Sequence, residues 1–384
     1  MAREEELEQF VSCWEGLADP RCGNATLHDF HELLMIALCC VLCGGQGPTD
    51  MALFARAKEA FLRGFLVLEN GLPSHDTFRR LFLDLDADQF RDSFQRFMAQ
   101  FSSQLQGVVA VDGKVLRRSF DTASGKSALH MVSAWGSEQR LVLAQIATDA
   151  KSNEITAVPK LLRMLSLKGT IVTADALNCQ RAIAAQIVEQ QGDYALALKA
   201  NQETLHDDVA LLLNDPEAPQ TTMAPEVEAG HGRIETRTAT VSTEIKWLQE
   251  QHQWPGLHPT DEDLSVGTPG LKAVGKVVRV RETAEKTTTE TAYYLLSKPL
   301  TPERLNEVAR QHWSVENSLH WRLDVVMNED QLRTRMGNGP HNLAVLRHMA
   351  INAMQKEGSK GSLRGKFKRA GWDDDFLHRL LEMF

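Results

Sequence analysis

The fold is decided by a short apolar stretch, GVVAVDGK at residues 107–114, and by a second one, GTIVTAD at residues 169–175. Each stretch is rich in β-forming residues and is bounded by turn residues, which predicts a short buried strand. Each apolar run ends on an aspartate, Asp112 or Asp175, and a small residue follows it. A single aspartate at this position is as often a turn former as a ligand. A pair at the ends of neighbouring strands, however, places two carboxylates close together.

The runs around these stretches predict a mixed α/β sheet with crossover helices. We expect strands over 108–111, 128–134 and 141–148, a helix over 154–165, a strand over 170–174, a helix over 179–190 and a strand over 194–198. Three strands, a helix, a strand, a helix and a strand form the chain order of a ribonuclease H-like core.

A third acid lies in a helix-like segment, RQHWSVENSLHW at residues 310–321. His312, Glu316 and His320 are spaced by four residues and share one helical face, with Trp313 and Trp321 beside it. An exposed glutamate is the ordinary alternative, and a His/Glu zinc site is another, but the zinc site leaves both aspartates unused. Three oxygen ligands without a thiolate favour Mg²⁺ or Mn²⁺. Two such ions promote in-line displacement at a phosphodiester.

The charge distribution argues weakly against nucleic-acid binding overall but permits it locally. The net charge is −9, so there is no global basic field. Lys114, Arg117 and Arg118 nevertheless follow Asp112 directly, where a groove for backbone phosphates would need them. A solvated face is the alternative for each basic cluster. No apolar run approaches the roughly 20 residues of a membrane span, and the acidic N-terminus is unlike a signal peptide, so we expect a cytoplasmic protein that contacts no membrane.

Residues 1–103 predict a helical N-terminal domain. The sequence GLPS at 71–74 breaks the chain and caps a helix that displays Arg79 and Arg80. Two short helices around such a turn are typical of a helix-turn-helix that binds DNA ends, although a bundle that merely packs fits equally well. The cysteine pair Cys40-x-x-Cys43 lies in an apolar helix without further ligands, which favours buried, reduced thiols over a zinc or redox site.

Residues 104–384 predict a catalytic domain interrupted by a β-rich insertion. Between about 203 and 290 the chain has a helix, a proline-rich acidic stretch and alternating apolar runs. It then returns to helices, one of which carries Glu316, and ends in a basic helical tail around residues 356–369.

Four segments together resemble the ISAs1 family of DDE transposases, which includes the H-repeat-associated proteins. They are VDGK at 111–114, TADALNCQ at 173–180, HGRIETR at 231–237 and HWSVENSLHW at 312–321. Residues 19–80 are similar to the domain that precedes the catalytic core in that family, so the resemblance covers nearly the whole chain. Related insertion-sequence transposases often carry Tyr, Arg and Lys around the glutamate, where this chain has Ala309, His312 and Leu323. Roles of those three residues are therefore not carried over.

The resemblance implies an insertion-sequence transposase that cleaves DNA and transfers strands, with two Mg²⁺ or Mn²⁺ ions held by Asp112, Asp175 and Glu316. The expected partners are double-stranded DNA, both element ends and target, and a second copy of the chain in a homodimer on DNA. The residues expected to contact DNA are Lys114, Arg117, Arg118, Arg310, His312, Trp313, Asn317, His320, Arg79 and Arg80. Two alternatives remain open at this point: a domesticated or immobile nuclease of the same type, and a non-catalytic DNA-binding protein.

Overall fold

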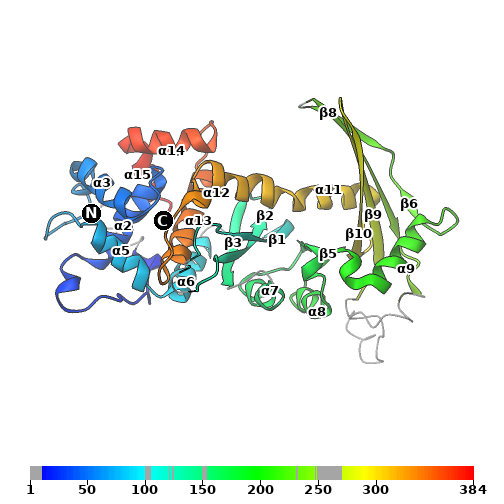
Figure 1. Ribbon diagram of the computed structural model, residues 1–384, viewed down its shortest axis with the longest axis horizontal. Coiled ribbons are helices and arrows are strands. Elements are labelled where there is room, and N and C mark those ends of the chain that lie inside the picture. The colour runs from blue at the N-terminus through cyan, green and yellow to red at the C-terminus, as the bar shows by residue number, and fades with distance from the viewer. Residues whose placement is uncertain are drawn as a thin grey trace.

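A large mixed sheet runs through the centre of the protein, with helices around it and a helical group at one end, as the computed structural model in Figure 1 shows. The structure describes residues 11–99, 105–120, 122, 125–148, 154–230, 232–246, 248 and 270–384. His231 and residues 249–269, which belong to the predicted insertion, lie outside the described part of the chain. The predicted α/β class with a mixed sheet is confirmed.

Five strands form the part of the sheet that carries the acidic residues. They are β1 (Gly107–Val115), β2 (His130–Gly136), β3 (Leu141–Thr148), β4 (Thr170–Ala174) and β5 (Asp193–Leu198). Their order across the sheet is β3-β2-β1-β4-β5. The first three pair antiparallel, whereas β4 pairs in parallel with both β1 and β5. β2 and β4 are buried along their whole length, as expected for strands covered on both faces.

Helices cover the two faces of this sheet. Figure 1 shows α7 (Glu154–Arg163) and α8 (Arg181–Glu189) on one side, and α11 (Pro302–His312) on the other. Two local signals begin α11, because the Thr301 side chain accepts a hydrogen bond from Arg304 N and Pro302 occupies the first turn. α11 contacts β1 and β4, so it lies directly over the strands that carry Asp112 and Asp175.

The segment predicted as an insertion continues the same sheet. β8 (Arg233–Ser242), β9 (Ala273–Thr283) and β10 (Thr287–Leu296) pair antiparallel in that order. The last residues of β10 pair with β5, from Tyr293–Leu198 to Leu296–Ala195. This pairing covers the edge that β5 would otherwise expose. The limits of the insertion at about 203 and 290 remain a prediction, since the sheet passes through the second of them without a break.

The helices near the two ends of the chain pack together. α2 (Phe30–Leu42), α3 (Pro48–Ala57), α5 (His75–Asp84) and α6 (Ala87–Ala99) come from the N-terminal part. α13 (Gly339–Lys356) contacts α2, α5 and α6, while α14 (Leu363–Trp372) and α15 (Asp374–Leu381) contact α2. The rings of Phe97 and Phe384 stack with centroids 4.3 Å apart. The two ends therefore share one core, and the division at residue 103 remains a prediction.

α2 is an apolar helix buried inside this group. Its side chains from Leu33 to Leu42 are buried, which accounts for the dense apolar pattern. Burial raises the pKa of the Cys39 and Cys40 thiols well above the usual range, so both are protonated at neutral pH. None of the helices in the described ranges combines the length and the hydropathy that a bilayer crossing requires.

Candidate active site

Asp112 and Asp175 lie at the same level on neighbouring parallel strands. In the register of β1 with β4, Val111 is the partner of Ala174, so the next residue on each chain is one of the two aspartates. Asp175 directly follows β4 and caps the short 3₁₀ helix η3 (Ala176–Asn178). Parallel pairing thus brings together the two carboxylates that the sequence pattern singled out.

One part of the prediction for Asp112 is wrong, because β1 does not end there. The strand continues to Val115, and its pairing with β2 runs from Asp112–Ser133 to Val115–His130. β2 is long enough to pair with these extra residues, whereas β4 stops at Ala174. Asp112 therefore lies just beyond the parallel pairing with β4 but inside β1, where the pairing with β2 holds its backbone.

Glu316 lies on η6 (Val315–His320), a π-helical segment between α11 and α12 (Trp321–Val325). The backbone N–H of Trp321 donates to the carbonyl of Glu316, which gives the wider turn. π-helical turns are rare and occur frequently at functional sites. The Glu316 side chain is exposed, so it is available to a bound ligand.

A buried tryptophan ties this helical segment to the sheet. The Ser314 hydroxyl accepts a hydrogen bond from Trp135 Nε1 at 3.1 Å and donates to the carbonyl of Gln311 at 2.6 Å. Trp135 is fully buried in β2, next to β1. These bonds fix the end of α11 relative to the strand that carries Asp112.

The acids of this site interact electrostatically. Burial raises the pKa of Asp112 to about 6; a hydrogen bond from the Gly113 backbone opposes the rise, while the charges of Asp175, Glu154 and Glu316 add to it. Asp175 and Glu316 therefore lie near enough to Asp112 to affect its pKa, and so does Glu154, a fourth carboxylate that the sequence analysis did not single out.

The raised pKa of Asp112 predicts a pH-dependent stability difference. Between its ordinary value of 3.8 and about 6, the folded state binds a proton that the unfolded state releases, so this group stabilises the fold as pH falls and the contribution is lost as pH rises. In a chelating buffer, Asp112→Asn should be more stable than wild type at pH 7, and the advantage should shrink towards pH 5. Urea unfolding at both pH values measures this; an advantage that does not change with pH would contradict it.

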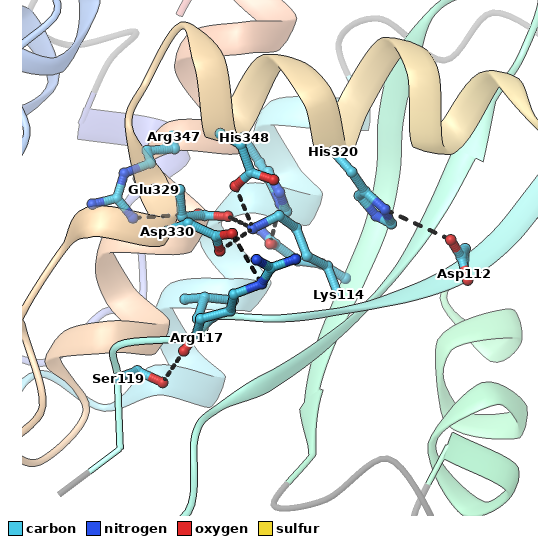
Figure 2. Close-up of polar contacts among 12 residues, drawn as sticks. Asp112, Lys114, Arg117, Ser119, His320, Glu329, Asp330, Arg347 and His348 are labelled. Atoms are coloured by element: carbon cyan, nitrogen blue, oxygen red, sulfur yellow. Dashed lines mark hydrogen bonds and ion pairs between the residues drawn. The ribbon is translucent and has the colours of Figure 1, made fainter.

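Two histidines flank the acids and are uncharged at neutral pH. His320 Nδ1 lies 3.6 Å from Asp112 Oδ2, as Figure 2 shows. His312 Nδ1 lies 3.0 Å from the Thr173 hydroxyl. Burial lowers the pKa of both imidazoles to about 4.

Lys114 is surrounded by carboxylates (Figure 2). Its Nζ lies 2.8 Å from Asp324 Oδ1, 3.0 Å from Glu329 Oε2 and 3.2 Å from Asp330 Oδ1. Glu329 is fully buried and is also 3.4 Å from Arg347 Nη1. Burial disfavours the charge of Glu329, but the nearby cations outweigh it and hold its pKa below the usual range. Lys114 thus joins the strand of Asp112 to the segment that follows α12.

The neighbouring arginines are more accessible. Arg117 is 79% exposed, with Nε 3.2 Å from Asp330 Oδ2, and the backbone carbonyl of Arg118 accepts a hydrogen bond from Arg335. A pocket of about 490 Å³ opens here between β1 and η6, lined by Gly113, Lys114, Val115, Arg117, Glu316, Asn317, His320, Trp321, Asp324 and Asp330. A larger pocket of about 850 Å³ lies at the opposite end of β1, beside Gly107, and none of the three acids lines it.

Arg310 and Trp313 face the long strands instead of the pocket. Arg310 pairs with Glu226 at 3.2 Å and with Glu228 at 2.7 Å. The Trp313 ring is half exposed, and the Arg279 guanidinium lies 5.8 Å from its centroid. Both residues therefore mark a surface between α11 and the extended part of the sheet.

Arg79 and Arg80 are exposed on α5, as the predicted recognition helix requires. The Ser74 side chain accepts a hydrogen bond from Thr77 N, which confirms the predicted cap of this helix. Arg79 pairs with Asp76 at 3.2 Å, one turn earlier on the same helix. Asp76 is itself half exposed, and an exposed pair of this kind leaves the arginine free to exchange partners.

Three buried residues near the acids were missed by the sequence analysis. Glu154, the first residue of α7, lies within hydrogen-bonding distance of His130 and Asn178. The sequence predicts Glu154 only as the first residue of a helix. Asn178 follows Asp175 by three residues, and this spacing is a signal that could have identified it. Nothing local to Glu154 or His130 distinguishes either from an ordinary polar residue, because their pairing joins distant segments.

The donor chemistry suits a hard divalent cation, since every acid here offers oxygen ligands. Burial is the main cause of the raised pKa of Asp112, and the charges of the neighbouring acids add a repulsion that a cation would relieve. Within the described ranges, however, no three His, Cys, Asp or Glu side chains already enclose an ion-sized space. The carboxylates are near one another but not closed around a common point.

Comparison with known proteins finds similarity along nearly the whole chain. Residues 103–353 match the family described as Transposase DDE domain, and residues 11–98 match the one described as DDE_Tnp_1-associated. "H repeat-associated putative transposase YhhI" and "Putative protein YbfL", both of Escherichia coli K12, are each 37% identical over 384 residues, which covers 98% of either chain. "Putative transposase YncI" of Escherichia coli O157:H7 is 32% identical over 374 residues, 95% of this chain and 92% of that one.

Proposed function

The chain belongs to the DDE transposase family, and on that premise we propose that Asp112, Asp175 and Glu316 are the acids with which this insertion-sequence transposase cleaves DNA and transfers strands. The observation that carries the assignment is the register of β1 with β4, which sets Asp112 beside Asp175. The contribution of Glu316 to the raised pKa of Asp112 supports its place as the third acid.

The proposed cofactor is a pair of Mg²⁺ or Mn²⁺ ions, which supply Lewis-acid activation of the attacking water or 3′-hydroxyl. Asp112 and Asp175 would hold them from the sheet, and Glu316 from the π-helical segment. Glu316 is exposed, so its side chain can rotate towards the two aspartates without disturbing the core. Divalent-metal dependence is a property of the family; the ion and the number are our proposal.

We further propose that β1 to β5, with α7, α8 and α11, form a ribonuclease H-like core. The spatial order β3-β2-β1-β4-β5, with one antiparallel and one parallel half, supports this. The helices of residues 11–99 are the proposed DNA-end-binding domain, and the long strands around β9 are the proposed insertion. In the DNA complex, two copies of the chain would act together on the two element ends.

The proposed DNA path runs along the pocket beside Glu316. Arg117, exposed at its rim, and Arg118 would neutralise phosphates near the scissile bond. Asn317 and His320 offer hydrogen bonds there, and His312 does so on the side of Asp175. Arg310 and Trp313 would contact DNA further out, over the extended sheet. Lys114 supports the pocket wall through its carboxylate partners and reaches DNA only if those pairs exchange.

The function is tested with purified protein and a plasmid that carries the element ends. We expect strand nicking that requires Mg²⁺ or Mn²⁺ and stops with a chelator, followed by joining of the freed 3′ ends to target DNA. Nicking without joining would assign the immobile nuclease instead. Binding without nicking, at any divalent metal concentration, would assign a non-catalytic DNA-binding protein and refute the proposal.

The N-terminal helices provide a separate prediction. Replacing Arg79 and Arg80 together with alanine should weaken binding of the element ends and flatten its salt dependence, by about 0.9 in the log–log slope for each phosphate that the variant no longer neutralises. A base contact by either arginine would add about 1–3 kcal/mol of sequence discrimination. Salt-titrated binding measures both effects.

The matched control replaces Arg56 of α3 and Arg63, which directly follows α4 (Glu59–Leu62), with alanine. It removes the same charge, and Arg63, like Arg79, pairs with an acid one turn earlier. If both double variants lose affinity equally, the effect is general electrostatics and α5 is not the recognition helix. If the α5 variant binds normally but melts earlier, the arginines only stabilise the helical group.

A further inference from the structure

Glu154 is a buried carboxylate to which the assignment of Asp112, Asp175 and Glu316 as metal ligands gives no role. It is 2% exposed at the first residue of α7. Its Oε1 lies 2.5 Å from His130 Nε2, and its Oε2 accepts a hydrogen bond from Asn178 Nδ2 at 3.0 Å. A buried carboxylate is costly unless its oxygens are satisfied, and here two side chains from different segments satisfy them.

The partner of Glu154 leads directly to Asp175. The same Asn178 side-chain nitrogen donates to Asp175 Oδ1 at 2.9 Å, and the Asn178 backbone N–H donates to that oxygen at 3.3 Å. Asp175 Oδ1 is therefore held twice, while its Oδ2 accepts no hydrogen bond from the described residues. One amide thus connects the buried Glu154 to a carboxylate that keeps an oxygen available for a ligand.

The opposite side of this network touches the strand of Asp112. A side chain at Gly113 would place its Cβ 2.3 Å from His130 Nε2 and 2.5 Å from Glu154 Oε1. Such a contact is impossible without moving the pair, so the glycine between Asp112 and Lys114 is what admits His130 and Glu154 to this position. The charge of Glu154 also reaches Asp112, where it contributes to the raised pKa.

We propose that Glu154 is a positioning residue of the metal site: clamped by His130, it orients Asn178, which in turn aims the carboxylate of Asp175. Both Glu154 oxygens are engaged by these partners, so the residue acts through Asp175 and is not itself a ligand. This inference rests on the proposed function, because it concerns the same acids. Outer groups that orient metal ligands typically contribute 10–100-fold to metal affinity or activity.

Two substitutions at Glu154 separate positioning from ligation. Glu154→Met keeps the length but offers no acceptor to Asn178. Glu154→Gln keeps an oxygen for Asn178, and its amide can donate to His130 in the other tautomer. Metal affinity is measured without DNA, by Mn²⁺ binding followed with electron paramagnetic resonance, and again as the Mg²⁺ concentration for half-maximal nicking. We expect Met to weaken both by about 10–100-fold and Gln to stay within a few-fold of wild type.

If Gln is as defective as Met, Glu154 is a direct ligand and the positioning proposal is overturned. If Met binds Mn²⁺ like wild type, the network has no role in the site and the proposal is again overturned.

A variant at Asn178 keeps the test decisive if Glu154→Met does not fold. Asn178→Leu removes the link to Asp175 while leaving Glu154 and His130 in place, and it should weaken Mn²⁺ binding by the same factor. Its matched control is Asn352→Leu on α13, a buried asparagine that bonds to Val142 in β3. The control should lose stability but not Mn²⁺ affinity. Equal Mn²⁺ affinity in the two leucine variants would refute the positioning role.

Asp175→Asn in the same Mn²⁺ titration distinguishes the two levels of inference. If that variant binds Mn²⁺ normally, the acid assignment itself fails. If it loses binding while the Glu154 and Asn178 variants do not, only the positioning role fails.

Discussion

The Asp112→Asn variant should lose DNA nicking by about a thousandfold or more while still binding DNA. The substitution keeps the shape of the side chain but removes the charge of a proposed metal ligand. Metal-ion stabilisation of developing charge is worth several kcal/mol, and about 4 kcal/mol corresponds to a factor of about a thousand in rate. DNA affinity should stay equal or rise slightly, because one carboxylate no longer repels the phosphates.

Single-turnover nicking and equilibrium DNA binding measure the two effects separately. The matched control is Asp193→Asn at the start of β5, the opposite end of the parallel strands, where the aspartate pairs with Lys298 at 2.6 Å. We expect the control to nick DNA at nearly the wild-type rate. Wild-type nicking by Asp112→Asn in Mg²⁺ would refute the metal assignment, and loss of DNA binding would indicate misfolding or a direct contact.

The largest expected effect on stability comes from Lys114→Met. The lysine side chain is 10% exposed and lies among three carboxylates, of which Glu329 is 1% exposed. Removing one member of a buried pair typically costs about 3–5 kcal/mol, because it leaves a buried charge without compensation. Arg347 still reaches Glu329 at 3.4 Å, so we expect a loss near 3 kcal/mol.

Urea denaturation of Lys114→Met, beside Lys298→Met, checks this prediction. Lys298 is 44% exposed in its pair with Asp193, and an exposed pair contributes at most about 1 kcal/mol. Adding Glu329→Gln to Lys114→Met should recover part of the loss, since it removes the stranded charge. A loss in Lys114→Met no larger than that in Lys298→Met would show that the cluster does not hold the fold together, and would return Lys114 to its predicted role as a phosphate contact.

Lys114 shows where a local pattern and a tertiary environment lead to different interpretations. By sequence it belongs with Arg117 and Arg118 in one basic cluster beside an acid. In the fold, Lys114 lies on the same face of β1 as Asp112, because side chains two residues apart on a strand point to the same side. That face meets α12 and the segment after it, whose carboxylates surround the lysine. Only Arg117 remains largely exposed.

Much of the core could be predicted from the sequence, as could the choice of the three acids as candidates, because these signals are local. The apolar run of β3 predicts its bounds, 141–148, without error. The cap at Ser74 marks the start of α5 because a hydroxyl three residues before a backbone N–H satisfies it. The aspartates after two apolar runs and the His-Glu-His spacing needed no knowledge of distant contacts. The ordering of strands and helices along the chain likewise follows from hydrophobic period and turn residues.

The tertiary structure alone decided which distant groups meet. β1 continues past Asp112 because its residues there pair with β2. β10 joins the sheet by pairing with the edge of β5 that β4 leaves unpaired. Glu154, His130 and Asn178 come from three separate segments, so no spacing along the chain links them. The N-terminal helices likewise share a core with α13, a segment far from them in the sequence. Capping and periodicity act between residues a few positions apart, whereas burial, strand pairing and the compensation of charge depend on neighbours that only the folded chain brings together.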